Sequence, residues 1–402
     1  MSGKSDKKKP LVPRLRFPEF REAGAWEVKR LGELASRITG RVGSKKLIPI
    51  SISSGVGFVS QAEKFGRDIS GKQYEKYIAL ERGQFSYNKG NSKTFPQGSI
   101  YQLQEFEDAA VPNAFYSFEF KKKYVPEFYN GYFEKNFHGH QLARFITSGA
   151  RSDGLLNISA ADFFSIVLPT PTNRDEQQKI AHCLSSLDEV IGLQAKKVQA
   201  LKQHKKGLMQ QLFPAEGETT PRLRFPEFRE AGAWDKQRIG DLLSLEYGAP
   251  LPEGSRLEGD IPVIGSNGVV GYHSEPLIKG PAIVIGRKGS AGQVSWIDSP
   301  CYPIDTTFFV DLSRKDCQLR FIYLLLEHHR LQELVREGGV PGLNRDDVYA
   351  VKATISKHTE QQKIAHCLSS LDEVIGLESH KLDALKNLKK GLMQQLFPQD
   401  VP

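Results

Sequence analysis

Two short loops combine positive charge, hydrogen-bond donors and glycine in a way that suits contact with nucleic acid. Lysine and arginine neutralise phosphates, glycine lets backbone amides approach closely, and asparagine, arginine and lysine match base edges in the major groove. The predicted DNA contacts of the first loop are Tyr87, Asn88, Lys89, Asn91, Ser92, Lys93 and Thr94, and those of the second are Arg287, Lys288 and Ser290. An ordinary surface turn is the alternative for either loop taken alone.

Further candidates lie in two glycine-rich loops and one polar, aromatic cluster. The loops contribute Arg151, Asn344 and Arg345, and the cluster contributes Tyr247, Asn267 and His273. For Asn344, capping of the structure that follows is an equally good interpretation. For His273, a purely structural, hydrogen-bonded role is the alternative.

No motif in the chain predicts catalysis. The segment Gly66–Gln73 resembles a phosphate-binding P-loop, but Gln73 replaces the Ser or Thr that would hold magnesium. No combination of histidine, cysteine and carboxylates has the spacing of a zinc site, and the Asn/Asp-Pro-Pro-aromatic motif of an amino-methyltransferase is missing. We therefore expect no metal or cofactor on this chain, and any covalent change to DNA would fall to another chain.

Composition favours an anionic partner and argues against a membrane. The formal net charge is +8 and the sequence pI is about 9.1, which suits nucleic acid without requiring it. The four cysteines include no C-x-x-C pair, and no apolar run approaches the ~18 residues that span a bilayer. We expect a reduced, cytoplasmic protein.

An internal duplication organises the chain. The segment PRLRFPEFREAGAW occurs at 13–26 and 221–234, EQQKIAHCLSSLDEVIGL at 176–193 and 360–377, and KKGLMQQLFP at 205–214 and 389–398. The interiors 27–175 and 235–359, called the first and second heads below, share almost no sequence. Copied flanks indicate one partner surface presented twice, and diverged heads indicate two different tasks. A recent duplication without consequence is the alternative.

The copied blocks that follow each head, at 176–214 and 360–398, predict two long helices. Apolar residues recur every three or four positions, the first helix begins near Asn173, and Pro214 follows its end. A one-sided seam of this length needs a partner, and the two helices are expected to pack on each other in antiparallel orientation. The lysines of the two helices, including Lys205 and Lys389, are expected to form a solvated flank, with contact to DNA phosphates as the alternative. The predicted packing residues are Ile180, Leu184, Leu187, Ile191, Leu201, Ile364, Leu368, Leu371, Ile375 and Leu385.

The two heads predict the same order of elements from different letters: strands, a helix, a glycine-rich loop ending in Leu-Asn, and a last strand. Predicted helices cover 128–148 and 319–336, and the predicted last strands cover 165–168 and 348–354. The fold class is α+β, with two mixed α/β domains separated by an antiparallel helical coiled coil and an internal pseudo-twofold. The expected boundaries are a basic arm 1–12, a recognition domain 13–172, a helix 173–213, a linker 214–231, a second recognition domain 232–356 and a second helix 357–398.

Several of these motifs, taken in order and occurring twice, resemble the specificity subunit of type I restriction-modification systems. They are Trp26 followed by Leu31-Gly32-Glu33, Trp234 followed by Ile239-Gly240-Asp241, GRKGS at 286–290 followed by Pro303 and Thr306-Thr307-Phe308, the Leu-Asn pairs at 156–157 and 343–344, and the EQQKIA openings of both helices. The first head departs from the pattern, since Asn88-Lys89-Gly90-Asn91-Ser92 stands in place of GRKGS.

The resemblance implies two target-recognition domains, each reading one half of a bipartite, asymmetric double-stranded DNA target, with helices that set the unread spacer. It further implies docking of two methyltransferase subunits that use S-adenosylmethionine, and of restriction subunits that use ATP and magnesium, so that this chain is not itself an enzyme. A two-headed protein-interaction scaffold without specific DNA binding is the alternative function. An enzyme with an unrecognised site is a third possibility.

Overall fold

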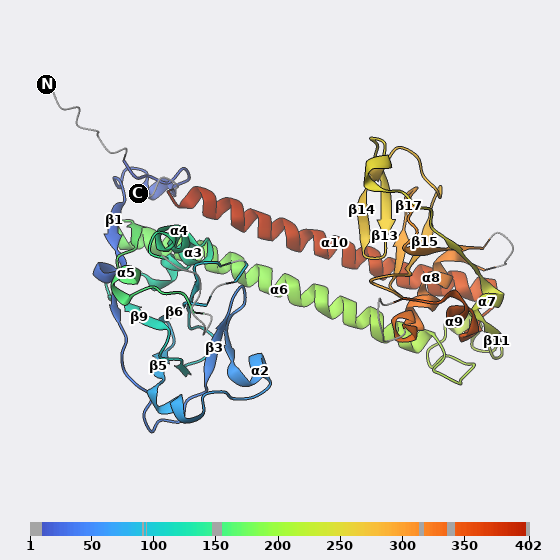
Figure 1. The fold of residues 1–402 in the computed structure, drawn as a ribbon, viewed down its shortest axis with the longest axis horizontal. Coiled ribbons are helices and arrows are strands. Elements are labelled where there is room, and N and C mark those ends of the chain that lie inside the picture. The colour runs from blue at the N-terminus through green and yellow to red at the C-terminus, as the bar shows by residue number, and fades with distance from the viewer. Residues whose placement is uncertain are drawn as a thin grey trace. The chain divides into compact units, whose positions relative to one another are not determined.

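The computed structural model describes residues 10–90, 92–93, 95–146, 155–312, 317–335 and 342–398 (Figure 1). The chain divides into two compact units. Unit 1 comprises 1–193 and 382–402, and unit 2 comprises 194–381. Each unit therefore holds one head together with a segment of each long helix.

The first head is built around a four-stranded antiparallel sheet in the order β2-β9-β6-β7. These strands are β2 (Ala35–Arg37), β9 (Tyr116–Phe120), β6 (Phe85–Asn88) and β7 (Ser99–Gln102). Two further hydrogen-bonded pairs are β3 (Ile50–Ser53) with β4 (Gly57–Ser60), and β5 (Ile78–Glu81) with β8 (Asp108–Val111).

Aromatic side chains fill the core of the first head. Phe120 stacks on Tyr129 with ring centroids 4.1 Å apart, and Phe85 stacks on Phe118 at 5.3 Å. The helix predicted over 128–148 is instead three short pieces, η3 (Pro126–Tyr129), α3 (Asn130–Glu134) and α4 (Phe137–Ala143). The break falls at Asn136, whose φ of 56° is left-handed and cannot continue a helix. The remaining short helices of this unit are η1 (Pro18–Phe20), α1 (Leu31–Leu34), α2 (Gln61–Phe65), η2 (Gly71–Lys76) and α5 (Ala160–Phe164).

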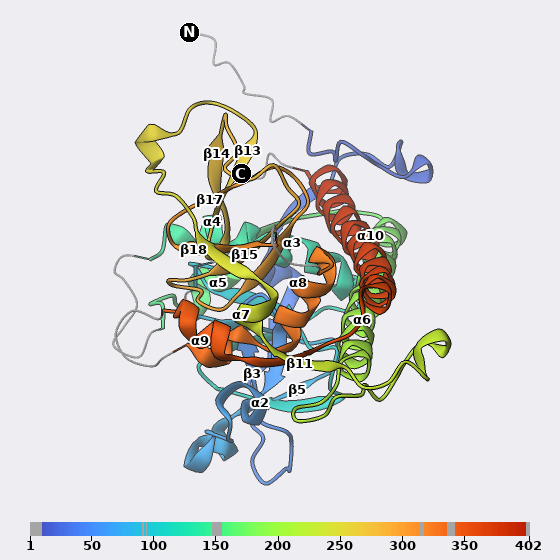
Figure 2. The ribbon, with the colours of Figure 1, turned by 90° about the vertical axis from the view of Figure 1, so that its right-hand side faces the viewer.

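The second head repeats the four-stranded sheet with different residues, in the order β12-β18-β15-β16. Its strands are β12 (Ser244–Tyr247), β18 (Thr307–Asp311), β15 (Ala282–Gly286) and β16 (Val294–Ile297). Figure 2 shows a second sheet beside it, in the order β14-β13-β17. That sheet consists of β14 (Gly268–His273), β13 (Ile261–Gly265) and β17 (Tyr302–Pro303).

The helices of the second head follow the prediction in part. The helix predicted over 319–336 is α8 (Leu319–His328) followed by η6 (Leu331–Leu334). The strand predicted over 348–354 was wrong in its first half, because α9 (Arg345–Ala350) occupies it and the strand β19 (Lys352–Ile355) starts later. The other short helices of this unit are η4 (Pro226–Phe228), α7 (Ile239–Leu242) and η5 (Glu253–Ser255).

In each unit the first strand of the head pairs antiparallel with its last strand. β1 (Glu27–Arg30) pairs with β10 (Val167–Thr170), and β11 (Asp235–Arg238) pairs with β19. This pairing brings the copied segment before each head next to the start of the long helix after it. The copied segment before each head therefore contacts the copied start of the long helix after it, and this contact is called the joint of the head.

The two long helices are α6 (Arg174–Leu212) and α10 (His358–Leu396). As predicted, Asn173 caps the first one, with its Oδ1 accepting from the Asp175 backbone N–H at 2.8 Å. In unit 1 the start of α6 shares a buried core with the end of α10, through Leu184 and Met393. In unit 2 the end of α6 shares a core with the start of α10, through Leu212 and Leu368. The pair is therefore antiparallel in both units, as the sequence predicted.

The predicted seam residues are buried to different degrees. Ile180, Leu184, Ile364 and Leu368 are buried in the cores of the units, whereas Leu187, Ile191, Leu201, Leu371, Ile375 and Leu385 are half-buried. Two polar residues of the seam, Gln194 and Glu378, face each other, since Gln194 Nε2 donates to the Glu378 carboxylate at 2.7 Å. This hydrogen bond satisfies the buried amide of Gln194, which would otherwise destabilise the helix pair.

Two lysines that the sequence placed in a solvated flank are in fact paired and mostly covered. Lys389 Nζ lies 2.7 Å from both Asp188 and Glu134, and Lys205 Nζ lies 2.7 Å from Asp372. Burial lowers the pKa of Lys389, but its hydrogen bonds to the two carboxylates outweigh this and leave the pKa above its usual value. The earlier expectation failed because the carboxylates come from the other helix and from the head.

Within the part of the chain described, no helix is both long enough and apolar enough to cross a membrane.

Candidate nucleic-acid interface

The two loops of the second head that the sequence singled out lie against each other. The first follows β15, and the second precedes α9. Leu343 donates its backbone N–H to the Arg287 carbonyl at 2.9 Å, and Lys288 forms a β-bridge with Gly342. Two candidate loops separated by about fifty positions in sequence therefore form one surface at the end of the sheet.

The first head makes the same junction with different residues. Leu156 donates its backbone N–H to the Lys89 carbonyl at 3.0 Å, and Gly90 forms a β-bridge with Leu155. Lys89 therefore occupies the position of Arg287, and Leu156 that of Leu343. The sequence predicted this correspondence of the two loops and of the two Leu-Asn pairs, and the matching contacts confirm it.

In the second head this junction carries an exposed aromatic ring between two guanidinium groups. The Arg287 guanidinium carbon lies 5.2 Å from the centroid of Tyr247, and that of Arg345 lies 5.4 Å from it. Tyr247 is 49% exposed, and Arg287 and Arg345 are half-buried beside it. Stacking on the ring restrains each arginine, and Arg287 Nη2 also donates to the Asp305 carbonyl at 2.9 Å.

The chemistry of this cluster fits an anionic or base-edge ligand. Arginine has five donors in a planar fork, and it binds phosphates or the O6 and N7 acceptors of guanine in two-point fashion. Arg345 Nε is buried and has no hydrogen-bond partner among the described residues. Arg287 Nε and Nη2 both donate to the Asp305 carbonyl, so a ligand would have to meet the remaining donors of the two guanidinium groups.

The first head has a related cluster, of which the sequence predicted Lys89 but missed Arg37 and Tyr116. Lys89 Nζ lies 4.7 Å from the ring centroid of Tyr116, and the Arg37 guanidinium carbon lies 5.3 Å from it. Arg37 ends β2 and Tyr116 begins β9, so only the pairing of these strands brings them together. The same is true of Phe308, which lies 5.9 Å from Arg287. No local signal in the sequence marks Arg37 or Tyr116, whereas Phe308 belongs to the Thr306-Thr307-Phe308 segment of the resemblance.

Three of the predicted contacts have structural roles, and two of them, Tyr87 and His273, are buried. Tyr87 is completely buried, and its hydroxyl donates to the Gln97 carbonyl at 2.7 Å, so its ring belongs to the core. Burial also raises the pKa of Tyr87. His273 is buried, and its Nδ1 accepts from the Leu257 backbone N–H at 3.0 Å. Asn344 caps α9, since its Oδ1 accepts from the Asp346 backbone N–H at 3.0 Å.

The other predicted residues lie around the two clusters. Asn88 Oδ1 accepts from the Gly90 backbone N–H at 2.9 Å, and Ser92 Oγ accepts from that of Phe95 at 3.0 Å, so both hold the loop of the first head. Ser290 Oγ lies 3.4 Å from Asn267 Oδ1, which brings Asn267 to the Arg287 loop. Lys93, Lys288 and Asn267 are exposed. Asn91, Thr94 and Arg151 lie outside the described residues.

No group of three or more His, Cys, Asp or Glu side chains that could hold a metal ion occurs among the described residues.

The chain is similar to proteins of one kind along nearly all of its length. The family model of the type I restriction modification DNA specificity domain matches it twice, at 24–203 and 232–387. The type I restriction enzyme MjaVIII specificity subunit of Methanocaldococcus jannaschii is 21% identical to it over 95% of this chain and 93% of that protein. A specificity subunit from Mycoplasma genitalium is 21% identical over 60% of this chain and 64% of its own length.

Solved structures show the same fold. The crystal structure of a type I restriction-modification S subunit from M. genitalium superposes with a TM-score of 0.63 at 17% identity, and covers 97% of this chain and 100% of its own. A chain from a study of complex assembly in the type I restriction-modification system gives a TM-score of 0.52 at 15% identity, and covers 94% of this chain and 98% of its own. With both of its heads matched by the family model, the chain belongs to the family of type I restriction-modification DNA specificity domains.

Proposed function

We propose that this chain is the DNA-recognition subunit of a type I restriction-modification complex, and that each head reads one half of a bipartite, asymmetric target. One observation supports this most directly. Two heads with unrelated sequences keep the same four-stranded sheet and place a cation on an aromatic ring at the equivalent loop, through Lys89 in one and Arg287 in the other. Two different half-sites require different side chains at equivalent positions of the two heads.

The copied flanks support a second part of the proposal, which concerns partners. Two methyltransferase subunits that use S-adenosylmethionine dock on the repeated frame, and restriction subunits that use ATP and magnesium join them in the cytoplasm. The covalent chemistry takes place on those subunits. The long helices fix the number of unread base pairs between the half-sites. The alternative of a protein-interaction scaffold without specific DNA binding is not favoured, because the family model that matches both heads is a DNA specificity domain.

The test substitutes the two equivalent cations one at a time. Arg287→Ala should weaken or relax one half-site, and Lys89→Ala should affect the other, by about 1–3 kcal/mol or roughly 5–150-fold in affinity. Selection of bound sequences from a randomised DNA library, together with titrations at two salt concentrations, measures both effects. Exposed lysines away from the clusters, Lys122→Ala and Lys279→Ala, serve as matched controls. Equal loss at both half-sites after either substitution would contradict the assignment.

A further inference from the structure

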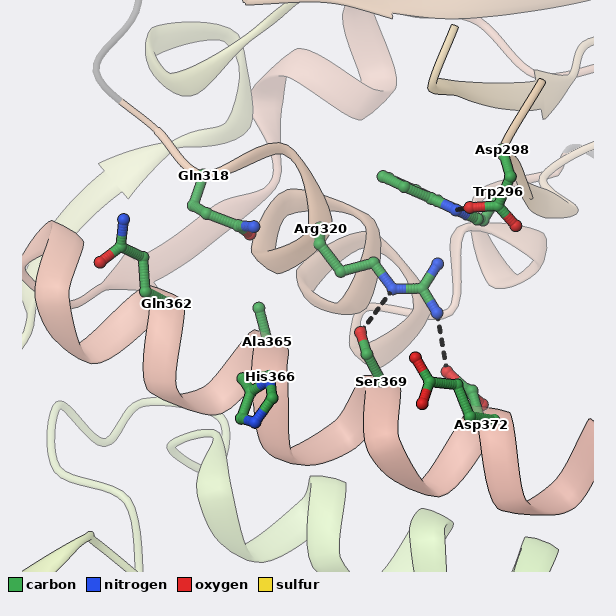
Figure 3. A pocket seen from close by; sticks show the side chains of 10 residues that line it. Trp296, Asp298, Gln318, Arg320, Gln362, Ala365, His366, Ser369 and Asp372 are labelled. Atoms are coloured by element: carbon green, nitrogen blue, oxygen red, sulfur yellow. Dashed lines mark hydrogen bonds and ion pairs between the residues drawn. The ribbon is translucent and has the colours of Figure 1, made fainter.

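Each unit contains a groove between its head and a long helix. In unit 2 the groove has a volume of about 570 Å³, and Trp296 and Arg320 of the head face α10 across it (Figure 3). In unit 1 a groove of about 550 Å³ lies between the first head and α6. Neither groove includes any of the cationic residues assigned above to DNA.

The two grooves have the same floor and different walls. In unit 1 the floor includes Ala181, Ser185, Asp188 and Glu189, and in unit 2 it includes the copied Ala365, Ser369, Asp372 and Glu373. The walls come from the diverged heads, with Trp296 in the groove of unit 2 and Tyr101 in the groove of unit 1. A ligand that used the floor would find it twice in the molecule, whatever DNA sequence each head reads.

Both grooves are acidic, although the chain as a whole carries a net charge of +8. The groove of unit 2 has three carboxylates, Asp298, Asp372 and Glu373, against one guanidinium. Asp372 pairs with Arg320 at 2.9 Å and with Lys205 at 2.7 Å, so Asp298 and Glu373 supply the remaining negative charge. The groove of unit 1 has five carboxylates, of which Asp188 and Glu134 pair with Lys389, so three further carboxylates remain there. DNA phosphates would be repelled from such grooves, and a basic partner would be attracted.

An exposed leucine extends each floor by one helical turn. Leu193 follows Glu189 by four residues and is 60% exposed, and Leu377 follows Glu373 by four residues and is 71% exposed. Residues four apart lie on the same face of a helix. The copied surface therefore offers an apolar contact next to an acidic one, which is the pattern expected of a protein interface rather than of a nucleic-acid interface.

We propose that each groove, with the leucine one turn beyond it, receives a basic segment bearing an apolar side chain from one methyltransferase subunit. Two copies of the same partner then bind two grooves that share the same copied floor residues. This inference rests on the proposed function, and it adds the place and the chemistry of docking. The carboxylates of Glu189 and Glu373 supply charge complementarity, and Leu193 and Leu377 supply the apolar contact.

The test reverses the charge of the floor in the full chain. The chain is expressed together with the methyltransferase subunit of its own system, and the number of bound copies is measured by native mass spectrometry and by titration. Glu189→Arg and Glu373→Arg should each weaken one of the two binding events about tenfold or more, and the double variant should weaken both. Asp383→Arg, an exposed substitution on α10 at a position that was not copied, is the matched control and should leave two copies bound.

The outcomes separate this inference from the proposed function. Glu189 and Glu373 are exposed, so the thermal unfolding midpoint of each variant should match that of the unsubstituted chain. If the unsubstituted chain binds two methyltransferase subunits and the double variant still binds both with unchanged affinity, the inference is overturned while the proposed function stands. If the unsubstituted chain binds neither methyltransferase nor specific DNA, the proposed function itself fails.

Discussion

The joint between head and helix in unit 1 can be compared residue by residue with the joint in unit 2. In unit 1 the guanidinium of Arg16 donates twice to Glu176, with both distances 2.7 Å. In unit 2 Arg224 donates twice to Glu360, at 2.7 and 2.8 Å. All four side chains are nearly buried. In unit 1 the Trp26 indole also donates to Glu176 at 3.2 Å, whereas the Trp234 indole N–H has no acceptor among the described residues.

The heads held by these joints differ far more than the joints do. They share a four-stranded sheet in the same order, but the first adds two two-stranded pairs and the second adds one three-stranded sheet. The comparison teaches that copied sequence preserves the attachment, while divergence is confined to what the attachment carries. A different head could therefore be carried without changing the copied joint.

The largest expected effect concerns the aromatic residue that follows each long helix. Phe397 is buried in the core of unit 1, and Phe213 is buried in that of unit 2. Phe397→Ala and Phe213→Ala should each reduce the free energy of unfolding by about 3–5 kcal/mol, because each leaves a large cavity. Hydrogen exchange should show lost protection in unit 1 for the first and in unit 2 for the second. Leu388→Ala, at an exposed position, is the control, and loosening of the wrong unit would contradict the division of the chain.

The next effect would sharpen the comparison of the two joints. Glu176→Gln and Glu360→Gln should each cost about 3 kcal/mol in the free energy of unfolding, because a buried guanidinium loses its counter-charge. The Glu176 variant should cost up to about 1 kcal/mol more, since the Trp26 hydrogen bond is weakened too. Urea unfolding measures both. As a check, Trp26→Phe should be more destabilising than Trp234→Phe, and identical losses in the two units would show that the indole contact contributes nothing.

The smallest effect is a pH response in the first head. Burial lowers the pKa of His138 to about 4, so the folded chain resists protonation that the unfolded chain accepts below about 6.5. Stability should therefore fall as the pH drops from about 6.5 towards 4, by about 2 kcal/mol at pH 5. Hydrogen exchange of unit 1 at pH 7.5 and pH 5 measures this loss. His138→Gln keeps a donor for the Gly98 carbonyl and should remove this pH dependence from unit 1, while His329, with a pKa also lowered to about 4, maintains one in unit 2. An unchanged pH response in the variant would rule out His138 as its source.

The sequence was sufficient for the frame because the signals there are local or repeated. Identical segments predicted two equal attachments, and apolar residues every three or four positions predicted two long helices. Pro214 and Asn173 marked the limits of the first helix, and the structure confirms both. The antiparallel pairing followed from the duplication, because a repeated seam can pack on its own copy.

Only the tertiary structure decided which side chains reach the candidate DNA surface. Tyr87 and Lys89 are neighbours in a predicted loop, yet the first is buried against the core and the second stacks on Tyr116 from another strand. Arg37 was invisible to spacing arguments for the same reason. Contacts between strands depend on which strands pair and in which register, and that choice is made by long-range packing in the core rather than by the letters of one loop. The sequence by itself therefore determined the repeated attachment, and the fold determined the surfaces that the attachment presents.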